Sequence, residues 1–271
     1  MPLSLPEARP LAEAGRVVVR LENLHKRFRG AHGDVTALQD VNLEIPENAF
    51  VSLVGPSGCG KSTILNMVAG LMEPTSGTVL FRGQPVTEVN TSVGYVTQES
   101  KLFPWLTVEE NVGFPLTVRG YPRTERRGLV AEHLQMVGLN GFEKAYPRQL
   151  SGGMQKRASI IRTLIYDPEV VLMDEPFGPL DAQTRMLLQD ELLRIWSRRK
   201  KTIVFITHDL VEAIALSDVV VVLSNRPATV RAVIEVPLTR PRNVFEIHQM
   251  KGFAETYDAL WRIFRHELHI G

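Results

Sequence analysis

The sequence predicts an α/β fold with a mostly parallel core sheet, and three observations lead to that prediction. An apolar run at 50–54 precedes a glycine-rich loop and a helix-compatible stretch at 64–71. A wholly apolar run at 170–173 has the composition of a strand buried on both faces of a parallel sheet. From position 170 to position 223 strands and helices alternate, which is typical of parallel α/β sheets.

The first third of the chain predicts an antiparallel β subdomain next to the start of the core. Alternating apolar and polar residues surround a polar loop at 29–34. The buried strand at 50–54 then leads into the glycine-rich loop, whose helix is expected to end near Gly70. The strands expected in this part cover residues 17–22, 35–38, 41–45, 50–54, 78–81 and 93–97.

The middle third predicts an α-helical subdomain inserted in the core, from about position 100 to position 166. Thr107 and Glu110 have the spacing of a capping box that opens a helix. Residues 124–137 have helical spacing with charged faces. Ser151, followed by two glycines, is expected to cap a further helix that runs to about position 166.

The last third completes the alternating pattern and adds a helical tail. The segment 243–269 carries an apolar stripe at helical spacing, which is more often packing than a partner site. The domain boundaries follow: a flexible arm at 1–16, one domain at 17–236 and a helical extension at 237–271. The elements expected here are a helix at 182–199, a strand at 202–206, a helix at 210–216, a strand at 218–223 and a peripheral strand at 230–236.

The composition excludes several classes of protein. The 31 basic and 30 acidic residues leave a net charge of +1, so no global field favours nucleic acid. Cys59 is the single cysteine, which excludes an intrachain disulfide and suits a reducing compartment. No run approaches the roughly 20 apolar residues that span a bilayer. Because residues 1–16 also lack an apolar block of signal-peptide length, we expect the chain to stay in the cytoplasm.

The glycine-rich loop has the spacing G-x-x-x-x-G-K-[ST] and predicts a site for the phosphates of a nucleotide, which by itself leaves kinases, GTPases and ATPases open. Its glycines let backbone N–H groups wrap a phosphate, Lys61 supplies a positive charge, and the Ser62 hydroxyl can ligate Mg²⁺. The following helix adds the positive end of its dipole. A simple turn that carries a lysine is disfavoured by the strand before it and the helix after it. The loop comprises Gly55, Pro56, Ser57, Gly58, Cys59, Gly60, Lys61, Ser62 and Thr63.

Two adjacent carboxylates follow the apolar strand at 170–173. Ligands of open α/β sheets bind at the carboxyl ends of the strands, where Asp174 and Glu175 stand. We expect Asp174 to hold Mg²⁺, directly or through water, and Glu175 to orient the attacking water or accept its proton. Without the phosphate loop, an ordinary acidic turn would be the better interpretation.

Taken together, the motifs resemble, in order and spacing, those of the ATP-binding subunits of ABC transporters. The resemblance covers about residues 17–236, and the joint occurrence of six motifs is far more specific than any one of them. The fold it implies is a P-loop NTPase of the ABC ATPase type. The residues that carry it are the loop at 55–63, Gln98, the segment 150–155, the segment 170–175, Leu180 with Asp181, and His208.

The resemblance implies that two copies of the chain bind two ATP molecules between them. In that family the segment that here contains Ser151, Gly152 and Gly153 faces the nucleotide bound by the second subunit. An N-cap followed by two glycines exposes N–H groups and a positive helix end to an anion, which suits this use. An ordinary glycine-rich helix cap is the alternative. Met154 replaces the glutamine of the commonest family form, and little effect on phosphate contact is expected.

The resemblance also assigns roles to four further residues. Gln98 would reach the Mg²⁺ and the attacking water, and His208 would hydrogen-bond the γ-phosphate. Asp181 would lie in the loop that crosses between subunits, where Pro179 replaces the usual small residue and could stiffen the crossing. Phe28 occupies the place of an aromatic ring, usually tyrosine, that stacks on adenine; a core phenylalanine is the alternative.

The resemblance further implies a separate transmembrane permease subunit. The segment 101–106 carries apolar and aromatic residues near Gln98, and we hypothesise that it receives a short cytoplasmic helix of that permease. The alternative is that Phe103 and Trp105 are core residues of the subdomain. The protein would then act at the cytoplasmic face of a bacterial cell membrane, and a periplasmic or extracellular solute-binding protein would be an indirect partner.

Subfamily motifs favour an importer of small anionic or zwitterionic solutes. The segments 173–178, 180–185, 189–196 and 225–230 resemble the nitrate/sulfonate/taurine importer ATPases. Nitrate, taurine, alkanesulfonates, bicarbonate and a vitamin precursor remain open as cargo, since the cargo does not touch this subunit. Other transport systems and soluble ABC-type ATPases of DNA repair or ribosomes are alternatives. The last are disfavoured because the chain has one phosphate loop and no long heptad run, and a kinase is disfavoured because no acceptor site is evident.

Overall fold

The computed structural model describes residues 16–30, 33–198 and 200–267, which fall into two compact units. We call the first, with residues 1–91 and 197–271, the phosphate-loop unit, and the second, with residues 92–196, the helical unit. Nearly all of the predicted arm at 1–16, the end of the predicted helix at 182–199 and the last four residues of the predicted extension lie outside the described residues.

An antiparallel sheet forms one part of the phosphate-loop unit, as predicted. Its strand order is β2-β1-β4-β5. The sequence-based prediction divided this region too finely, because 35–38 and 41–45 form one strand and the strand at 17–22 continues to Phe28. Register shifts near Asn23 and Asp40, both with positive φ, bend these strands without ending them. The strands are β1 (Val17–Phe28), β2 (Val35–Pro46), β4 (Ser76–Phe81) and β5 (Gln84–Pro85).

The other part of this unit is a mostly parallel sheet with the strand order β10-β9-β3-β8, in which β9, β3 and β8 are parallel. Every residue of β3 (Phe50–Val54), β8 (Thr202–Thr207) and β9 (Val219–Leu223) is buried, which explains their nearly continuous apolar sequences. The peripheral strand predicted at 230–236 is β10 (Val230–Glu235), which pairs antiparallel with β9. Helix α1 (Lys61–Val68) follows β3 and helix α6 (Leu210–Leu216) follows β8.

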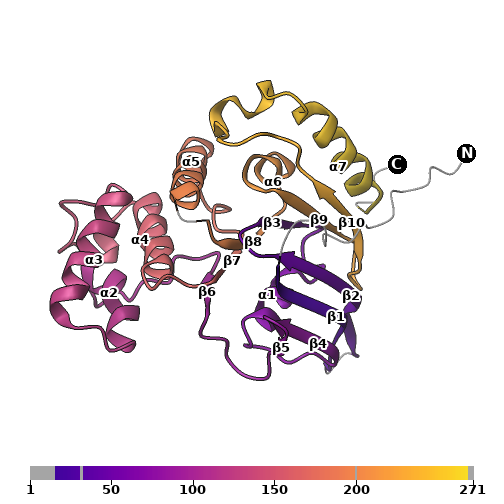
Figure 1. Cartoon of the computed structure of the whole chain (residues 1–271), viewed down its shortest axis with the longest axis horizontal. Coiled ribbons are helices and arrows are strands. Elements are labelled where there is room, and N and C mark those ends of the chain that lie inside the picture. Colours follow the sequence, from indigo (N-terminus) through magenta and orange to yellow (C-terminus); the bar gives the residue numbers. More distant parts are fainter. Residues whose placement is uncertain (1–15, 31–32, 199, 268–271) are drawn as a thin grey trace, which may run out of the picture. The chain divides into compact units, whose positions relative to one another are not determined.

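The C-terminal tail packs on the same unit. The prediction of a single helical segment at 243–269 is wrong. The structure has a 3₁₀ helix, η2 (Val244–Gln249), followed by a separate helix, α7 (Phe253–Glu267). Gly252, with φ of +91°, lies between them in a conformation that a continuous helix cannot contain. Helix α7 covers α6, β9 and β10 (Figure 1). Its apolar side buries Phe253, Leu260, Ile263 and Phe264 in one cluster with α6.

The helical unit begins with the parallel pair of β6 (Val93–Val96) and β7 (Val170–Asp174). Between these strands the chain forms the predicted group of helices, and α2, α3 and α4 pack together (Figure 1). Their core contains Val112, Leu116, Leu134 and Ile161. The helices are α2 (Val108–Val118), α3 (Arg123–Met136), η1 (Pro147–Gln149), α4 (Gly152–Leu164) and α5 (Ala182–Arg198).

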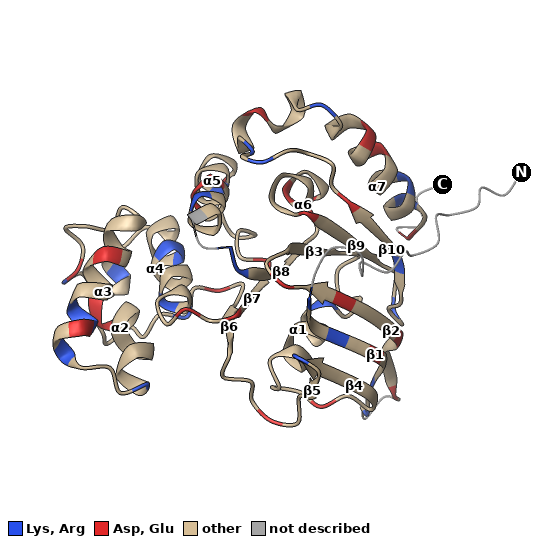
Figure 2. Cartoon of the chain, in the orientation of Figure 1, with Lys and Arg blue, Asp and Glu red and all other residues tan. Residues whose placement is uncertain are grey.

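The described helices are all too short or too polar to cross a bilayer. Helix α2 carries two acidic residues, Glu109 and Glu110, whereas α3 carries both Arg and Glu (Figure 2). The surface of these helices therefore carries charges of both signs.

Candidate nucleotide site

The predicted site residues are divided between the two units. The phosphate-loop unit holds Phe28, residues 55–63 and His208. The helical unit holds Gln98, Asp174, Glu175, Asp181 and the segment from Ser151 to Gly153.

The phosphate loop connects the buried strand β3 to helix α1, as the motif requires. Gly58 and Gly60 have φ values of +72° and +131°, a region that other residues rarely adopt. A Cβ atom on Gly60 would lie 2.7 Å from Leu38 Cδ2. Gly60 is also the N-cap of α1 and provides no side-chain hydrogen bond, so the first N–H groups of the helix have no side-chain cap. This geometry suits an anion.

Lys61 is folded back onto the loop that precedes it. Its side chain is only 5% exposed, and Nζ donates to Gly55 O at 2.7 Å and to Pro56 O at 2.9 Å. An ammonium has three N–H donors, and the two carbonyl groups take two of them. Cys59 is buried beside it, and burial raises the pKa of its thiol. A thiol held protonated in this way agrees with a filler role better than with a redox switch.

Phe28 and His208 lie at the ends of strands in the same unit. Phe28 ends β1, is 38% exposed, and has the ammonium of Lys26 5.3 Å from its ring centroid. It is therefore not the core phenylalanine that was the alternative to an adenine platform. His208 is exposed between β8 and α6. Asp209 caps α6 by accepting from the N–H groups of Val211 and Glu212 at 2.8 and 3.2 Å, which fixes the backbone next to the imidazole.

In the helical unit, Asp174 ends β7 and is held by a hydrogen bond to Tyr95 of the neighbouring β6. Burial and the Asp174 carboxylate both raise the pKa of the Tyr95 phenol, so the phenol stays a proton donor. Lys156 of α4 is 2% exposed and donates to the carbonyl oxygens of Thr97 and Gln98 at 2.7 and 3.0 Å. Burial lowers the pKa of Lys156 to about 8, against the opposing effect of Asp174.

The side chains of Glu175 and Gln98 both lie close to Gly178 in this unit. A Cβ atom on Gly178 would lie 3.6 Å from Gln98 Nε2 and 3.8 Å from Glu175 Oε2. Glu175 itself has a φ of +40° and accepts from Gly178 N at 3.2 Å in a tight turn. A non-glycine residue in this region is strained, and such strain is found often at functional sites. The structure thus brings together two residues that the sequence predicted to act on the attacking water.

The segment at the start of α4 has the predicted cap. Ser151 Oγ accepts from Met154 N at 3.3 Å. Gly152 faces open space, whereas a Cβ on Gly153 would lie 2.8 Å from Thr184 Cγ2. Thr184 N in turn donates to Asp181 Oδ1 at 3.0 Å, a bond that lowers the pKa of Asp181. Within one chain, therefore, the glycine segment and the Asp181 loop lie next to each other.

A groove of about 550 Å³ in the helical unit joins three of these segments. It is lined by the Gln98 loop, by Gly152 and Lys156 of α4, and by Pro179 and Leu180 of the turn after β7. Sequence reasoning missed Tyr95, Lys156 and Thr184. Of these three, only Lys156 could have been noticed in the sequence. It is a cation about one turn after the start of the helix that opens with the segment from Ser151 to Gly153.

Comparison with known proteins shows which family the chain belongs to. The family model described as ABC transporter matches residues 38–178. An uncharacterized ABC transporter ATP-binding protein of Methanocaldococcus jannaschii is 51% identical over 84% of this chain and 85% of its own length. The chain belongs to the family of ABC transporter ATP-binding subunits. The sequence-based resemblance is thereby confirmed, and the chain is an ATP-binding, ATP-hydrolysing subunit of a transporter.

A second relative carries a functional name. The aliphatic sulfonates import ATP-binding protein SsuB of Bacillus thuringiensis is 44% identical over 84% of this chain and 89% of its own length. Among solved structures, a dimeric ATP-binding cassette in a post-hydrolysis state with ADP and Pi aligns with a TM-score of 0.72 and 33% identity. That alignment covers 80% of this chain and 98% of the other. The predicted ABC ATPase fold is confirmed.

Proposed function

We propose that the chain is the ATP-hydrolysing motor of an importer of small anionic or zwitterionic solutes, with sulfonates as the leading class. The observation that carries the motor role is the presence of two helix N-termini suited to phosphate, at α1 and at α4. The importer class is supported by the relative named for the import of aliphatic sulfonates. An ABC ATPase of another transport system is the alternative.

The site residues would divide the reaction among them. Lys61 and the loop N–H groups bind the phosphates, and the Phe28 ring stacks on adenine. Glu175 accepts a proton from the attacking water or orients it, and His208 donates to the γ-phosphate. Lys156 holds the backbone of Gln98 in place.

Mg²⁺ would be held by Asp174, the Ser62 hydroxyl and the Gln98 amide oxygen. These are hard oxygen donors of the kind that Mg²⁺ prefers, and Tyr95 orients the carboxylate. Across the described part of the chain, no group of three or more His, Cys, Asp or Glu side chains could hold a metal ion by itself. This fits an ion that takes its other ligands from phosphates and water.

A second copy of the chain would complete the site. Gly152 is exposed at the start of α4, and an added Cβ would meet nothing there, so an anion from outside the unit would have room to approach this helix N-terminus. In the proposed dimer it meets the γ-phosphate bound by the other copy, and Asp181 lies in the crossing loop. Closing on ATP and opening after hydrolysis gives the two states that a transporter needs.

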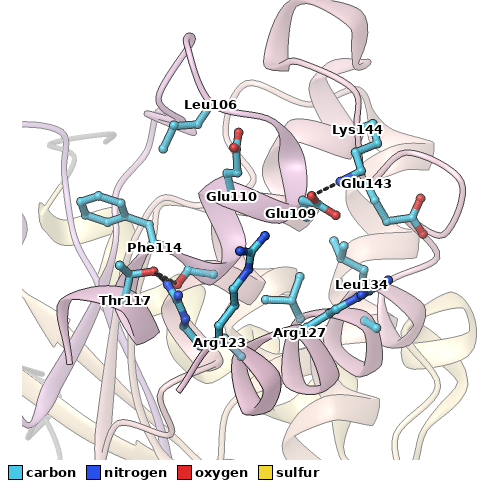
Figure 3. Close-up of a pocket in the computed structure, with 14 residues that line it drawn as sticks. Leu106, Glu109, Glu110, Phe114, Thr117, Arg123, Arg127, Leu134, Glu143 and Lys144 are labelled. Atoms are coloured by element: carbon cyan, nitrogen blue, oxygen red, sulfur yellow. Dashed lines mark hydrogen bonds and ion pairs between the residues drawn. The ribbon is translucent and has the colours of Figure 1, made fainter. Parts of the chain in front are cut away.

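The permease would dock on the helical unit, at the cytoplasmic face of the membrane. Trp105 is 70% exposed, and its ring centroid lies 5.5 Å from that of Phe103, which lies 4.8 Å from that of Phe114. This exposure agrees with the docking hypothesis for 101–106, and it means that Trp105 is not a core residue. Phe114 and Leu106 also line an adjoining groove of about 880 Å³ (Figure 3).

The charges of this groove indicate the chemistry of the partner. Arg123 and Arg127 of α3 line it, opposite the ion pair of Glu109 and Lys144 (Figure 3). A short amphipathic helix with an apolar face and at least one carboxylate would fit. A solute-binding protein would act on the permease and not on this chain.

The first experiment tests the ATP-dependent dimer. Glu175→Gln should slow hydrolysis by roughly 100-fold or more, because the group that activates water is lost while nucleotide binding is kept. Sedimentation with ATP should then show stable dimers, and with ADP monomers. A Glu175→Gln protein that stays monomeric with saturating ATP would contradict the proposal.

The second experiment tests the importer class. The chain is co-purified with its membrane partner and the solute-binding protein, and hydrolysis is measured in proteoliposomes with alkanesulfonates, taurine or nitrate outside. Stimulation by sulfonates supports the named class, whereas stimulation by a lipid or a cationic solute would contradict it. Trp105→Ala is expected to reduce assembly with the permease, and Leu187→Ala, also an exposed apolar side chain, is the matched control.

A further inference from the structure

The last turn of α7 carries a largely buried carboxylate that is bonded to the loop after β9. The side chain of Glu267 is 13% exposed. Its Oε2 accepts from Asn225 N at 3.0 Å, and its Oε1 lies 2.9 Å from Arg231 Nε. The backbone oxygen of Glu267 also accepts from Asn225 Nδ2. Helix α7 therefore ends on the loop 224–229 through both its side chain and its backbone.

This loop is held by its own hydrogen bonds. Ser224 Oγ donates to Asn225 O at 2.7 Å and accepts from Thr229 N at 2.9 Å. Ser224 N donates to Thr229 O at 3.0 Å. Because Ser224 is buried and bonded to Thr229 through both its backbone and its side chain, the two ends of the loop are held together.

The same loop supports the phosphate loop from two sides. Ala228 N donates to Ala37 O at 2.8 Å, and Gln39 N donates to Ala228 O at 3.0 Å, so Leu38 is fixed between them. Leu38 Cδ2 is the atom that lies 2.7 Å from a Cβ built on Gly60.

The second support comes from the end of β9. A Cβ built on Gly55 would lie 3.1 Å from the backbone oxygen of Leu223, the residue just before the loop. The first and sixth residues of the phosphate-loop motif thus pack against Leu223, which directly precedes the loop 224–229, and Leu38, whose two neighbours are hydrogen-bonded to that loop.

We infer that Glu267 is a positioning residue for nucleotide binding: through the loop 224–229 it fixes Leu38 and Leu223, against which the phosphate loop packs. It does not touch the nucleotide. Backbone donors bind phosphate well only when they are preorganised, so a looser support lowers affinity more than it lowers the rate of the chemical step. The inference rests on the proposed nucleotide site at residues 55–63.

The test compares three variants of the full chain. In Glu267→Ala, the Kd for ADP and the KM for ATP should rise about fivefold or more, with kcat within about twofold of wild type. Glu267→Gln keeps an acceptor for Asn225 N and should give an intermediate rise in KM. Asp258→Asn removes an exposed carboxylate from the same helix and should leave both constants unchanged. Calorimetry measures Kd, and a phosphate-release assay measures KM and kcat.

Two results would overturn the inference. One is a Kd and KM in Glu267→Ala within twofold of wild type. The other is a loss of activity that equals the unfolded fraction measured by circular dichroism at the assay temperature, because that is a purely structural effect. Lys61→Ala separates this inference from the proposed site: if it abolishes ADP binding while Glu267→Ala does not alter it, only the positioning role fails.

Discussion

Helix α1 and helix α4 both begin with glycines, yet the two N-termini are built in different ways. At α1 the glycines Gly58 and Gly60 have positive φ, and no side chain caps the helix. At α4 a serine, Ser151, caps the helix, and neither Gly152 nor Gly153 needs positive φ. The first set of glycines lets the loop adopt backbone conformations that other residues rarely adopt, whereas the second removes side chains from an exposed and a crowded position.

This difference teaches what each N-terminus can do. A loop that wraps back toward its own helix, with Lys61 bonded to its carbonyl groups, is suited to a phosphate bound by the same chain. A capped helix start with an open Gly152 presents donors outward and is suited to a phosphate that another molecule brings. Helix α2 is a third case, because Thr107 and Glu110 complete a capping box and occupy the first donors.

The largest effect is expected at Gly60. Gly60→Ala places a Cβ at a φ of +131° and 2.7 Å from Leu38, which costs about 1–3 kcal/mol of strain and shifts the loop donors. Calorimetry should show a loss of ADP affinity of more than about tenfold. Gly120→Ala is the control, since Gly120 also has positive φ but lies in the helical unit with no atom near a built Cβ. If both variants bound ADP as wild type does, the wrapped-loop interpretation of α1 would fail.

A smaller and different effect is expected at Gly152. Gly152→Ala meets open space, so folding and ADP binding by the single chain should not change. ATP-dependent dimerisation and hydrolysis should fall by about tenfold, because the methyl group would stand where the second copy's phosphate approaches. Gly128→Ala in α3, where a Cβ also meets nothing, is the matched control. Normal hydrolysis by Gly152→Ala would contradict the outward-facing role of α4.

The cap of α4 should make a modest contribution to stability. Ser151→Ala removes the acceptor of Met154 N and should lower the free energy of unfolding by about 1 kcal/mol. Ser151→Thr keeps an acceptor and should recover most of that loss. Urea unfolding followed by circular dichroism measures both. An unchanged unfolding midpoint in Ser151→Ala would show that the serine does not act as a cap.

Sequence alone could predict the parts of this molecule that depend on local chemistry. The phosphate loop, the capping boxes and caps of α2 and α4, and the apolar strands β3, β7 and β9 all follow from short patterns. It could not predict that α7 begins only after Gly252, because apolar spacing continues across the break between η2 and α7. Nor could it find Tyr95, whose role arises only when β6 and β7 pack together, and the helical position of Lys156 did not reveal that this side chain donates to the backbone at 97–98.

The smallest effect, at the capped start of α2, concerns pH. Hydrogen bonds from the backbone and hydroxyl of Thr107 lower the pKa of Glu110 below its ordinary value of 4.5. A carboxyl whose pKa is lower in the folded state stabilises the fold at pH values above 4.5 and loses that contribution as pH falls through the folded pKa. Glu110→Gln should therefore have a lower free energy of unfolding than wild type at pH 7. The difference between the two free energies should disappear as the pH falls below that pKa. Glu132→Gln in α3, an exposed carboxylate, is the control, and a gap for Glu110→Gln that is constant from neutral to acidic pH would mean that its charge plays no part in capping α2.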